Sequence, residues 1–299
     1  MAENLIDLRR RIKTVKSTQK TFRAMKTVSA VKLRRSVTEL NKTKPVIDKI
    51  SSLLKRVEPA VDIDSHPFLK PREDGKIVMV IISADKGLSG AFNSHLIAAA
   101  EAHYLSRLNE TGNNINLIIA GNKAITYFSK KGYPILKSYK SVMSRLKSHH
   151  GAELSGYLQD IYLNPAENIK QIEFIFTQYQ SASRSVPEIK QLFPLGGEWQ
   201  QVEMNIDREE DDDIEYIFEP TEKEIFTYLL PKYIDARVQQ ILLQSAASEH
   251  KARMIAMEQA SQNAEEIVRT LTLSMNKLRQ ASITGELLEI ITATEALKK

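Results

Sequence analysis

The feature that most constrains this chain is the scarcity of helix-breaking residues at its N-terminal end. Residues 3–57 contain no glycine, and Pro45 is their only proline. Apolar or small side chains recur there every three or four residues, which is the period of one helix face. The spacing predicts a coiled-coil helix over residues 1–58, about 80 Å long, which Pro45 kinks or interrupts. The stripe consists of Leu5, Leu8, Ile12, Val15, Phe22, Met25, Ser29, Leu33, Val37 and Leu40, then Ile47, Ile50, Leu53, Leu54 and Val57.

A second helical stripe runs through the C-terminal end. From Glu219 onward the chain holds two prolines, Pro220 and Pro231, and one glycine, Gly285. The stripe follows a strict three–four spacing, and all but two of its positions carry Leu, Val, Met or Ala, as in a coiled-coil seam. We therefore predict a coiled-coil helix over residues 219–299 that starts at Pro220. The seam positions are Leu243, Ala247, His250, Met254, Met257, Ser261, Ala264, Val268, Leu271, Met275 and Leu278.

Two stripes of matching period at opposite ends of one chain can bury each other. The segment between them returns the chain, so the predicted pairing is antiparallel. The seam is poor in Leu and Ile and contains Ser29, His250 and Ser261, which favours a rod held inside a partner. Residues 283–297 are apolar on most sides of the helix. We expect them to extend beyond the N-terminal helix and to be covered by another protein.

The middle of the chain has a different sequence pattern, which predicts an α/β domain over residues 76–210. Continuous β-branched runs alternate with helical patterns, which is typical of a mostly parallel sheet covered by helices. The fold class is therefore α/β: a long antiparallel coiled coil of the terminal helices plus a central Rossmann-like domain. The predicted strands are 76–83, 114–121 and 172–180, with short edge strands at about 189–193 and 201–206; the predicted helices are 94–109, 122–131 and 152–163; residues 58–76 read as a loop.

Charge and composition limit the classes of function that this chain can have. Residues 1–44 carry 13 basic side chains against three acidic ones, a net charge of +10, whereas residues 209–213 read EEDDD. A polycation of this kind needs water or an acidic partner. The chain has no cysteine, which excludes disulfides and thiolate catalysis. It also has no apolar run near the ~20 residues of a membrane span and no signal-peptide pattern, so we expect the cytoplasm or a cytoplasmic membrane face.

Candidate chemical sites are sparse. The sequence GLSG at Gly87–Gly90 lies between a predicted strand and a helix, where phosphate-binding loops occur. It lacks the full glycine pattern and the Walker lysine, so a tight turn is the favoured interpretation. The histidines, including His149, His150 and His250, show no metal-ligand spacing. The EEDDD run lacks the glycine and spacing of a calcium loop. We predict no catalytic residues, no cofactor and no metal.

Three blocks of sequence resemble one known family, the gamma chains of F-type rotary ATP synthases. They are LRRRIKTVKSTQKTFRAMKTVSAVKLRRS at 8–36, SADKGLSGAFN at 83–93, and EHKARMIAMEQASQNAEEIV from Glu249, running on to LSMNKLRQASITGELLEIITATEAL, which ends at Leu297. The resemblance covers the whole chain in order. The redox-regulatory cysteine insertion of chloroplast relatives is absent.

The resemblance implies a function. A gamma chain is the non-catalytic central stalk, whose coiled coil enters a hexameric ring of alternating alpha and beta subunits. Its globular domain sits on the proton-driven c-ring together with the epsilon subunit. Rotation of the gamma chain drives ATP synthesis, and the gamma chain itself does not contact nucleotide. The implied place is the cytoplasmic side of the cell (inner) membrane, as a peripheral subunit. The implied contacts with the alpha/beta ring are Met25, Lys26, Arg279, Gln280, Thr284 and Glu286.

Two other functions remain open from the residues alone. A small nucleotide-binding α/β enzyme with helical extensions would use the loop at Gly87–Gly90. A coiled-coil nucleic-acid binder would set the basic N-terminal face against phosphates. That face lacks interleaved aromatic residues and a groove-reading motif, and docking against acidic loops of a partner suits a rigid helix better. No nucleic-acid partner is therefore expected.

Overall fold

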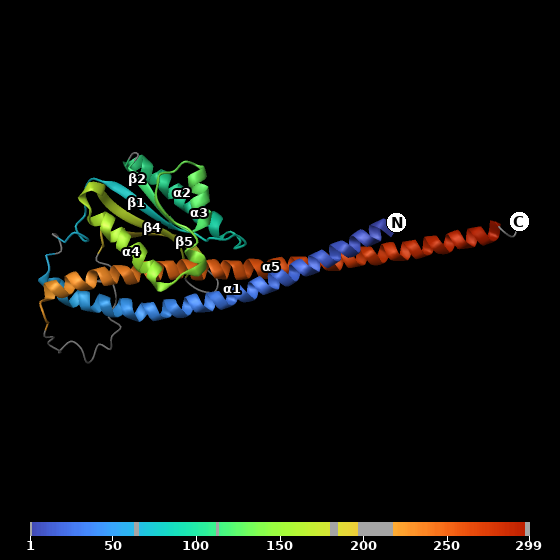
Figure 1. Cartoon of the computed structure of the whole chain (residues 1–299), viewed down its shortest axis with the longest axis horizontal. Helices are drawn as coiled ribbons and strands as arrows, with labels where there is room; N and C mark the ends of the chain where they lie inside the picture. Colours follow the sequence, from blue (N-terminus) through green and yellow to red (C-terminus); the bar gives the residue numbers. More distant parts are fainter. Residues whose placement is uncertain (1, 63–65, 112–113, 180–184, 197–217, 297–299) are drawn as a thin grey trace. The chain divides into compact units, whose positions relative to one another are not determined.

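The computed structural model describes residues 2–62, 66–111, 114–179, 185–196 and 218–296 (Figure 1). The chain is α/β, with a long helix at each end and a mixed, mostly parallel sheet between them in sequence, as predicted. It divides into two compact units. The coiled-coil unit is Met1–Ala30 with Arg253–Lys299, and the α/β unit is Val31–Ala252.

Both predicted terminal helices are present. Helix α1 spans Ala2–Val57 and helix α5 spans Glu222–Ala296. The expected interruption at Pro45 is wrong, because α1 continues through it. Pro45 is exposed, so the carbonyl that loses its helical partner there can bond to water. The start at Pro220 is also wrong: Thr221 precedes the helix and its hydroxyl accepts the Glu224 N–H at 3.3 Å, as an N-cap does.

The sheet has five strands in the order β3-β2-β1-β4-β5. The first four are parallel and β5 is antiparallel to β4. The three predicted main strands and the edge strand near 189–193 are confirmed, β3 was not predicted, and residues 201–206 lie outside the described residues. The strands are β1 Lys76–Ile82, β2 Ile115–Ala120, β3 Ile135–Tyr139, β4 Ile169–Tyr179 and β5 Ser185–Phe193.

The helices that connect the strands also follow the prediction. They are α2 Phe92–Thr111, α3 Asn122–Lys130 and α4 Ser148–Leu163, with short 3-10 helices η1 Glu58–Ala60, η3 Met143–Arg145 and η4 Pro165–Glu167. Gly121 precedes α3 with φ 104°, and a Cβ there would lie 2.0 Å from the Ser83 carbonyl oxygen. Only glycine fits this junction between β2 and α3.

Each face of the sheet has its own core. Successive strand residues point to opposite faces, so Ile77 and Met79 do not share a side with Val78 and Val80 in their buried clusters. Helices α2 and α3 cover the first face. Helix α4 covers the second, together with the parts of α1 and α5 that belong to the α/β unit (Figure 1).

The predicted loop over residues 58–76 contributes to the second core. Phe68 is 6% exposed, and its ring stacks on Phe193 with 5.1 Å between centroids. Tyr162 of α4 stacks on the same Phe193 at 4.6 Å. Phe68 therefore anchors this otherwise polar, proline-containing segment, between the end of α1 and β1, to the hydrophobic core.

Within the coiled-coil unit, α1 and α5 run antiparallel. Gln19 bonds to Glu265, Arg23 to Ser261, and Lys26 pairs with Glu258. Residue numbers rise along one helix as they fall along the other, which is the signature of antiparallel pairing. Eight of the eleven predicted seam positions of α5 lie in this unit, and Leu243, Ala247 and His250 lie in the α/β unit. The predicted seam is confirmed, because none of the eleven is exposed.

Candidate partner-contact surfaces

The four C-terminal contact residues lie on one broad exposed side of α5. Arg279, Gln280, Thr284 and Glu286 are all exposed. At 3.6 residues per turn, Arg279 and Glu286 share one face, and Gln280 and Thr284 share the adjacent face. The Thr284 hydroxyl donates to its own helix at the Gln280 carbonyl, 2.9 Å away, and Glu286 accepts from Ser282 at 3.2 Å. The guanidinium and amide of this set face solvent and are suited to bind a polar partner.

The two N-terminal contact residues lie elsewhere in the coiled-coil unit. Met25 is partly buried in the seam, and Lys26 forms an ion pair with Glu258 of α5. Glu258 and Arg279 are separated by about 30 Å of helix. The structure therefore does not bring the six predicted residues into one site, but distributes them over two levels of the coiled coil.

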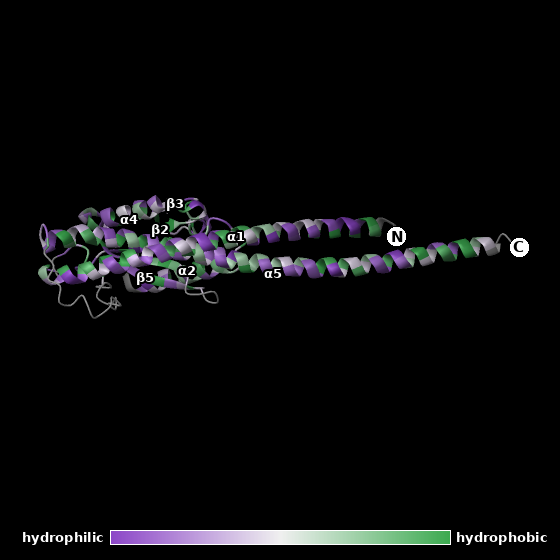
Figure 2. Cartoon of the chain, turned by 90° about the horizontal axis from the view of Figure 1, so that it is seen from below, coloured by the Kyte–Doolittle hydropathy of each residue, from purple (hydrophilic) through white to green (hydrophobic). Residues whose placement is uncertain are grey.

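The end of α5 exposes large apolar side chains. Ile283, Leu287, Leu288, Ile290 and Ile291 are each about half exposed or more, up to 61% for Ile290. Hydrophobic segments recur toward the C-terminal end of the helix in Figure 2. The register of the pairs between α1 and α5 places the first residues of α1 opposite about residue 282 of α5. Beyond that point no described helix of the coiled-coil unit faces α5, and an apolar stretch of this kind marks an interaction surface.

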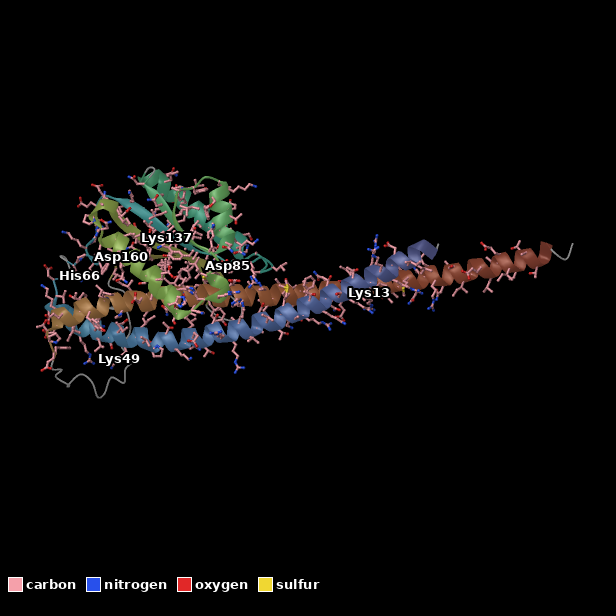
Figure 3. All side chains as sticks on the ribbon, in the orientation of Figure 1. Lys13, Lys49, His66, Asp85, Lys137 and Asp160 are labelled. Carbon is pink, nitrogen blue, oxygen red and sulfur yellow. The ribbon has the colours of Figure 1, made fainter. Side chains whose placement is uncertain are left out.

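The basic N-terminal segment is largely solvated. Lys13 is exposed (Figure 3). Arg11 pairs with Asp7 at 3.0 Å and Arg23 with Glu265 at 3.3 Å, all with side chains more than half exposed. Exposed pairs of this kind contribute little to stability. The cationic face is therefore accessible to an acidic partner.

The loop at Gly87–Gly90 closes on itself. Asn93 accepts the Ala84 N–H at 3.1 Å and donates to the Ser89 hydroxyl at 3.1 Å. Asp85, at the end of β1 (Figure 3), accepts the backbone N–H groups of Asn122 and Ser144 at 3.2 and 2.6 Å. Asn93 and Asp85 thus hold the segment with their own side chains, which favours the tight-turn interpretation over a phosphate cradle.

The described part of the chain offers neither a metal-binding cluster nor a membrane-spanning helix. No group of three or more His, Asp or Glu residues there is arranged to hold a metal ion. His149 and His150 are neighbours, with ring centroids 4.1 Å apart, but no carboxylate completes a site. None of the helices over these residues combines the length and the apolar character needed to cross a membrane.

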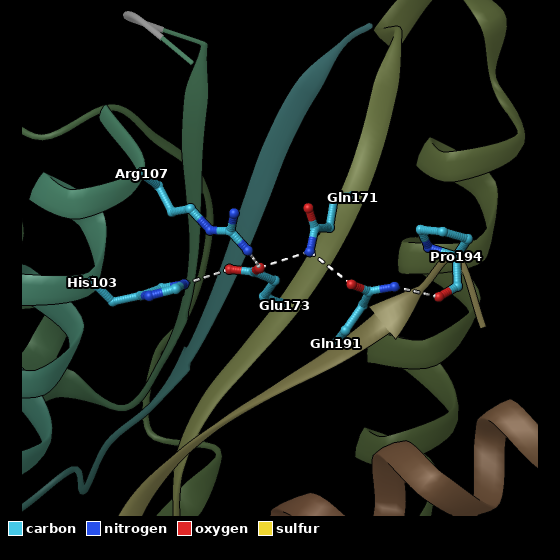
Figure 4. Close-up of polar contacts among 6 residues, drawn as sticks. All are labelled: His103, Arg107, Gln171, Glu173, Gln191 and Pro194. Carbon is cyan, nitrogen blue, oxygen red and sulfur yellow. Dashed lines mark hydrogen bonds and ion pairs between the residues drawn. The ribbon is translucent and has the colours of Figure 1, made fainter. Parts of the chain in front are cut away.

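Sequence reasoning missed a buried ionic network in the α/β unit (Figure 4). Glu173 of β4 is 2% exposed and accepts from Arg107 at 2.7 Å. His103 of α2 lies 2.6 Å from the other Glu173 oxygen, and Gln171 donates to Glu173 at 2.7 Å and to Gln191 of β5 at 2.8 Å. His103 and Arg107 precede Glu173 by about seventy residues in sequence, so no local motif predicts their contact with it. The network ties α2, β4 and β5 together.

A second polar cluster connects α2 with α3. Hydrogen bonds from Lys131, Tyr127 and Tyr133, in that order of effect, lower the pKa of Glu101 to about 2. The three donors lie 2.7 to 2.8 Å from the carboxylate. Glu101 thus acts as a structural acceptor that ties α2 to α3 and to the residues that follow α3.

Comparison with known proteins decides the family. The family described as ATP synthase matches residues 4–297. The ATP synthase gamma chain of Moorella thermoacetica is 36% identical over 98% of this chain and 98% of its own length. That of Pelotomaculum thermopropionicum is 37% identical over 99% of each. The chain belongs to the ATP synthase gamma chain family.

Solved structures show the same fold as this gamma-chain family member. A chain of the Euglena gracilis mitochondrial ATP synthase (OSCP/F1/c-ring) matches 99% of it with a TM-score of 0.62 and 17% identity, covering 95% of that chain. A chain of the Tetrahymena thermophila mitochondrial ATP synthase (central stalk/c-ring) matches 81% of it with a TM-score of 0.57 and 21% identity, covering 99% of that chain.

Proposed function

We propose that the chain is the central-stalk rotor subunit of an F-type ATP synthase. It couples proton-driven rotation of the membrane c-ring to ATP synthesis at the sites of the alpha and beta subunits. The observation that carries the proposal is the exposed apolar end of α5, from Ile283 to Ile291. A helix with such a surface needs a surrounding partner, and membership of the gamma-chain family identifies that partner as the alpha/beta ring.

The contacts divide by chemistry. Arg279, Gln280, Thr284 and Glu286 are exposed and polar, so they form the directional hydrogen bonds to the ring that define preferred rotor angles. The stretch beyond them is mostly apolar and carries few charges, Glu289 among them, which leaves a surface that slides without a deep angular minimum. Met25 and Lys26, which lie farther along the coiled coil from these four residues, contact an acidic loop of the beta subunit.

The three sequence segments take different parts in this function. The torque-bearing helices are α1, Ala2–Val57, and α5, Glu222–Ala296, within the predicted segments 1–58 and 219–299. Residues 76–210 form the domain that meets the c-ring and the epsilon subunit. The chain itself is non-catalytic and binds no nucleotide, and it acts as a peripheral subunit on the cytoplasmic side of the cell (inner) membrane.

Purification and single-particle rotation test the proposal together. The native chain should co-purify with alpha and beta subunits in a complex that hydrolyses ATP. In a reconstituted complex, Arg279→Ala with Glu286→Ala should shift or blur the dwell positions and lower ATP synthesis. The matched control is Glu266→Ala, an exposed change elsewhere on α5.

Three results would each count against the proposal. If the double variant leaves the dwell positions and ATP synthesis unchanged, the assignment of Arg279 and Glu286 as contacts with the ring is wrong. Tight binding of ATP to the isolated chain, measured by isothermal titration, would favour the nucleotide-binding enzyme instead. A salt-dependent shift of DNA by the chain would favour nucleic-acid binding.

A further inference from the structure

Helix α4 begins with a histidine in a capping position. Lys147 precedes the helix, and a lysine side chain has no acceptor to offer the N–H groups of the first turn. His150 instead accepts the backbone N–H of Lys147 on its ring Nδ1, at 3.1 Å. This is the half of a capping box that Glu or Gln at the third helical position normally supplies. The start of α4 therefore depends on an imidazole nitrogen.

This contact requires one protonation state of His150. Because the Lys147 N–H is a donor, Nδ1 carries a lone pair, and the ring is the neutral tautomer with its proton on Nε2. A protonated ring has two N–H donors and no acceptor. Protonation therefore sets two donors against each other. It also places a positive charge at a helix N-terminus, where the helix dipole opposes it.

The segment before α4, residues 143–147, is held by different chemistry at its two ends. At its first residues, Met143 is 2% exposed, and Asp85 accepts the Ser144 N–H at 2.6 Å. At its last residue, the acceptor is the ring of His150. One end is thus held by a carboxylate and the hydrophobic core. The other end is held by the type of side chain that gains a proton just below neutral pH.

The surroundings of His150 favour its neutral form. Burial lowers the pKa of His150 below its ordinary value of 6.5, and the rings and chains of His149 and Lys147 lower it further, whereas Glu153 raises it. Tyr139 of β3 lies near Glu153, and burial raises the pKa of Tyr139, so it adds no charge. The charged and titratable side chains of the groove that His149 lines are Arg145, Lys147 and His149 themselves, Lys32, Arg35 and Glu39 of α1, and His250 of α5. Lys42 already pairs with Glu39 at 2.9 Å.

We propose that His150 is a proton-operated latch on residues 143–147. With the ring neutral, His150 caps α4 and holds Lys147. With the ring protonated, the Lys147 N–H loses its acceptor, the first turn of α4 frays, and the exposed side chains of Arg145 and Lys147 lose their fixed positions. Acid thereby changes the side of the groove that this segment forms.

The latch is independent of the rotor contacts proposed above. It lies in the α/β unit, whereas those contacts lie in the coiled-coil unit. The sign of its effect follows from the lowered pKa of His150. Its contribution to stability is present above about pH 6.5 and is lost as the pH falls through the folded pKa.

Nuclear magnetic resonance on the isotopically labelled full-length chain tests the latch. At about pH 7.5 the ring of His150 should be the Nε2–H tautomer, and the Lys147 amide should be protected from hydrogen exchange. The protection factor removes the intrinsic pH dependence of exchange. It should fall about fivefold between about pH 7.5 and pH 5, as expected for the loss of a helix cap. An Nδ1–H tautomer at the higher pH, or a protection factor that does not change, would overturn the proposal.

Three variants separate the latch from a general effect of acid. His150→Gln keeps an acceptor that does not titrate, so Lys147 should stay protected at both pH values. His150→Ala should leave Lys147 poorly protected at both. His149→Gln is the matched control at the exposed neighbouring ring. It removes a nearby positive charge but not the latch, so the response should remain with its midpoint at a higher pH.

The comparison with His150→Gln decides the outcome. A pH response of Lys147 that persists in His150→Gln would assign the response to another group and contradict the latch. A response that disappears in His149→Gln would transfer the role to His149 and contradict it equally. If His150→Ala does not fold, as followed by circular dichroism, the wild type, His150→Gln and His149→Gln still give the full test.

Discussion

The two ends of helix α5 share one backbone geometry and have opposite surroundings. Near its start, Phe226, Leu230 and Tyr233 are at most 1% exposed and belong to the core of the α/β unit. Near its end, Leu288 and Ile290 are about 60% exposed. Apolar content alone therefore does not say what a helix segment is for. The start of α5 stabilises the fold, and its end is available to a partner.

The largest expected effect lies in the buried end. Phe226→Ala removes a fully buried ring and should lower the free energy of unfolding by about 3–5 kcal/mol. Urea denaturation followed by circular dichroism measures the loss. A loss below about 1 kcal/mol would mean that this core is loosely packed and that the contrast along α5 is weaker than described.

Leu288→Ala is the matched change at the exposed end. It should alter the free energy of unfolding by no more than about 0.5 kcal/mol, because the side chain is already in water. The same variant should reduce ATP synthesis in the reconstituted complex. A large loss of stability in the free chain would show that this end is buried within the chain itself.

Glu173→Ala tests the buried polar network of the α/β unit. Removing the carboxylate takes away the acceptor that Glu173 offers to Arg107 and His103 and should cost about 3 kcal/mol. Glu173→Gln keeps the shape and part of the hydrogen bonding, so its cost should be smaller. Equal costs for the two variants, measured by thermal unfolding, would show that packing rather than the ionic contacts stabilises the site.

The Lys26–Glu258 pair tests the coiled-coil unit, where both side chains are partly exposed. Lys26→Glu should cost about 0.5 kcal/mol or less, and exchanging the two charges should restore it. Both effects should fade at high salt. A cost that persists at high salt would show that Lys26 acts through packing.

A further effect is an acid sensitivity at Glu101. Its folded pKa, about 2, lies below the ordinary value of 4.5 because of its hydrogen bonds with Lys131, Tyr127 and Tyr133. The stability it contributes is present above about pH 4.5 and is lost as pH falls toward 2. Glu101→Gln should flatten the pH dependence of stability in that window. An unchanged slope would exclude Glu101 as its source.

Much of the fold was predictable because its signals are local. The three–four spacing of the seam locates its buried positions, and the β-branched runs locate β1, β2 and β4. Strand β3 was missed because its residues alternate between partly buried and exposed, as on a sheet edge, and include Lys137 and Ser138. The pairing of Glu173 with His103 and Arg107 was missed because it forms only when distant segments meet.

The contact residues show a different limit. The resemblance to the gamma-chain family suggests Arg279, Gln280, Thr284 and Glu286, and the structure shows that they are exposed on a common side of α5. Their role depends on atoms of another protein, which no pattern in this chain encodes.

In our proposal the end of α5 is covered by a partner and not by the chain itself. Because the chain has no cysteine, Leu288→Cys gives a single thiol whose labelling by a maleimide reports exposure. In the free chain the thiol should react nearly as fast as in the urea-unfolded chain. In the assembled complex it should be strongly protected. Slow labelling in the free chain, or equal labelling in the free chain and the complex, would contradict the account.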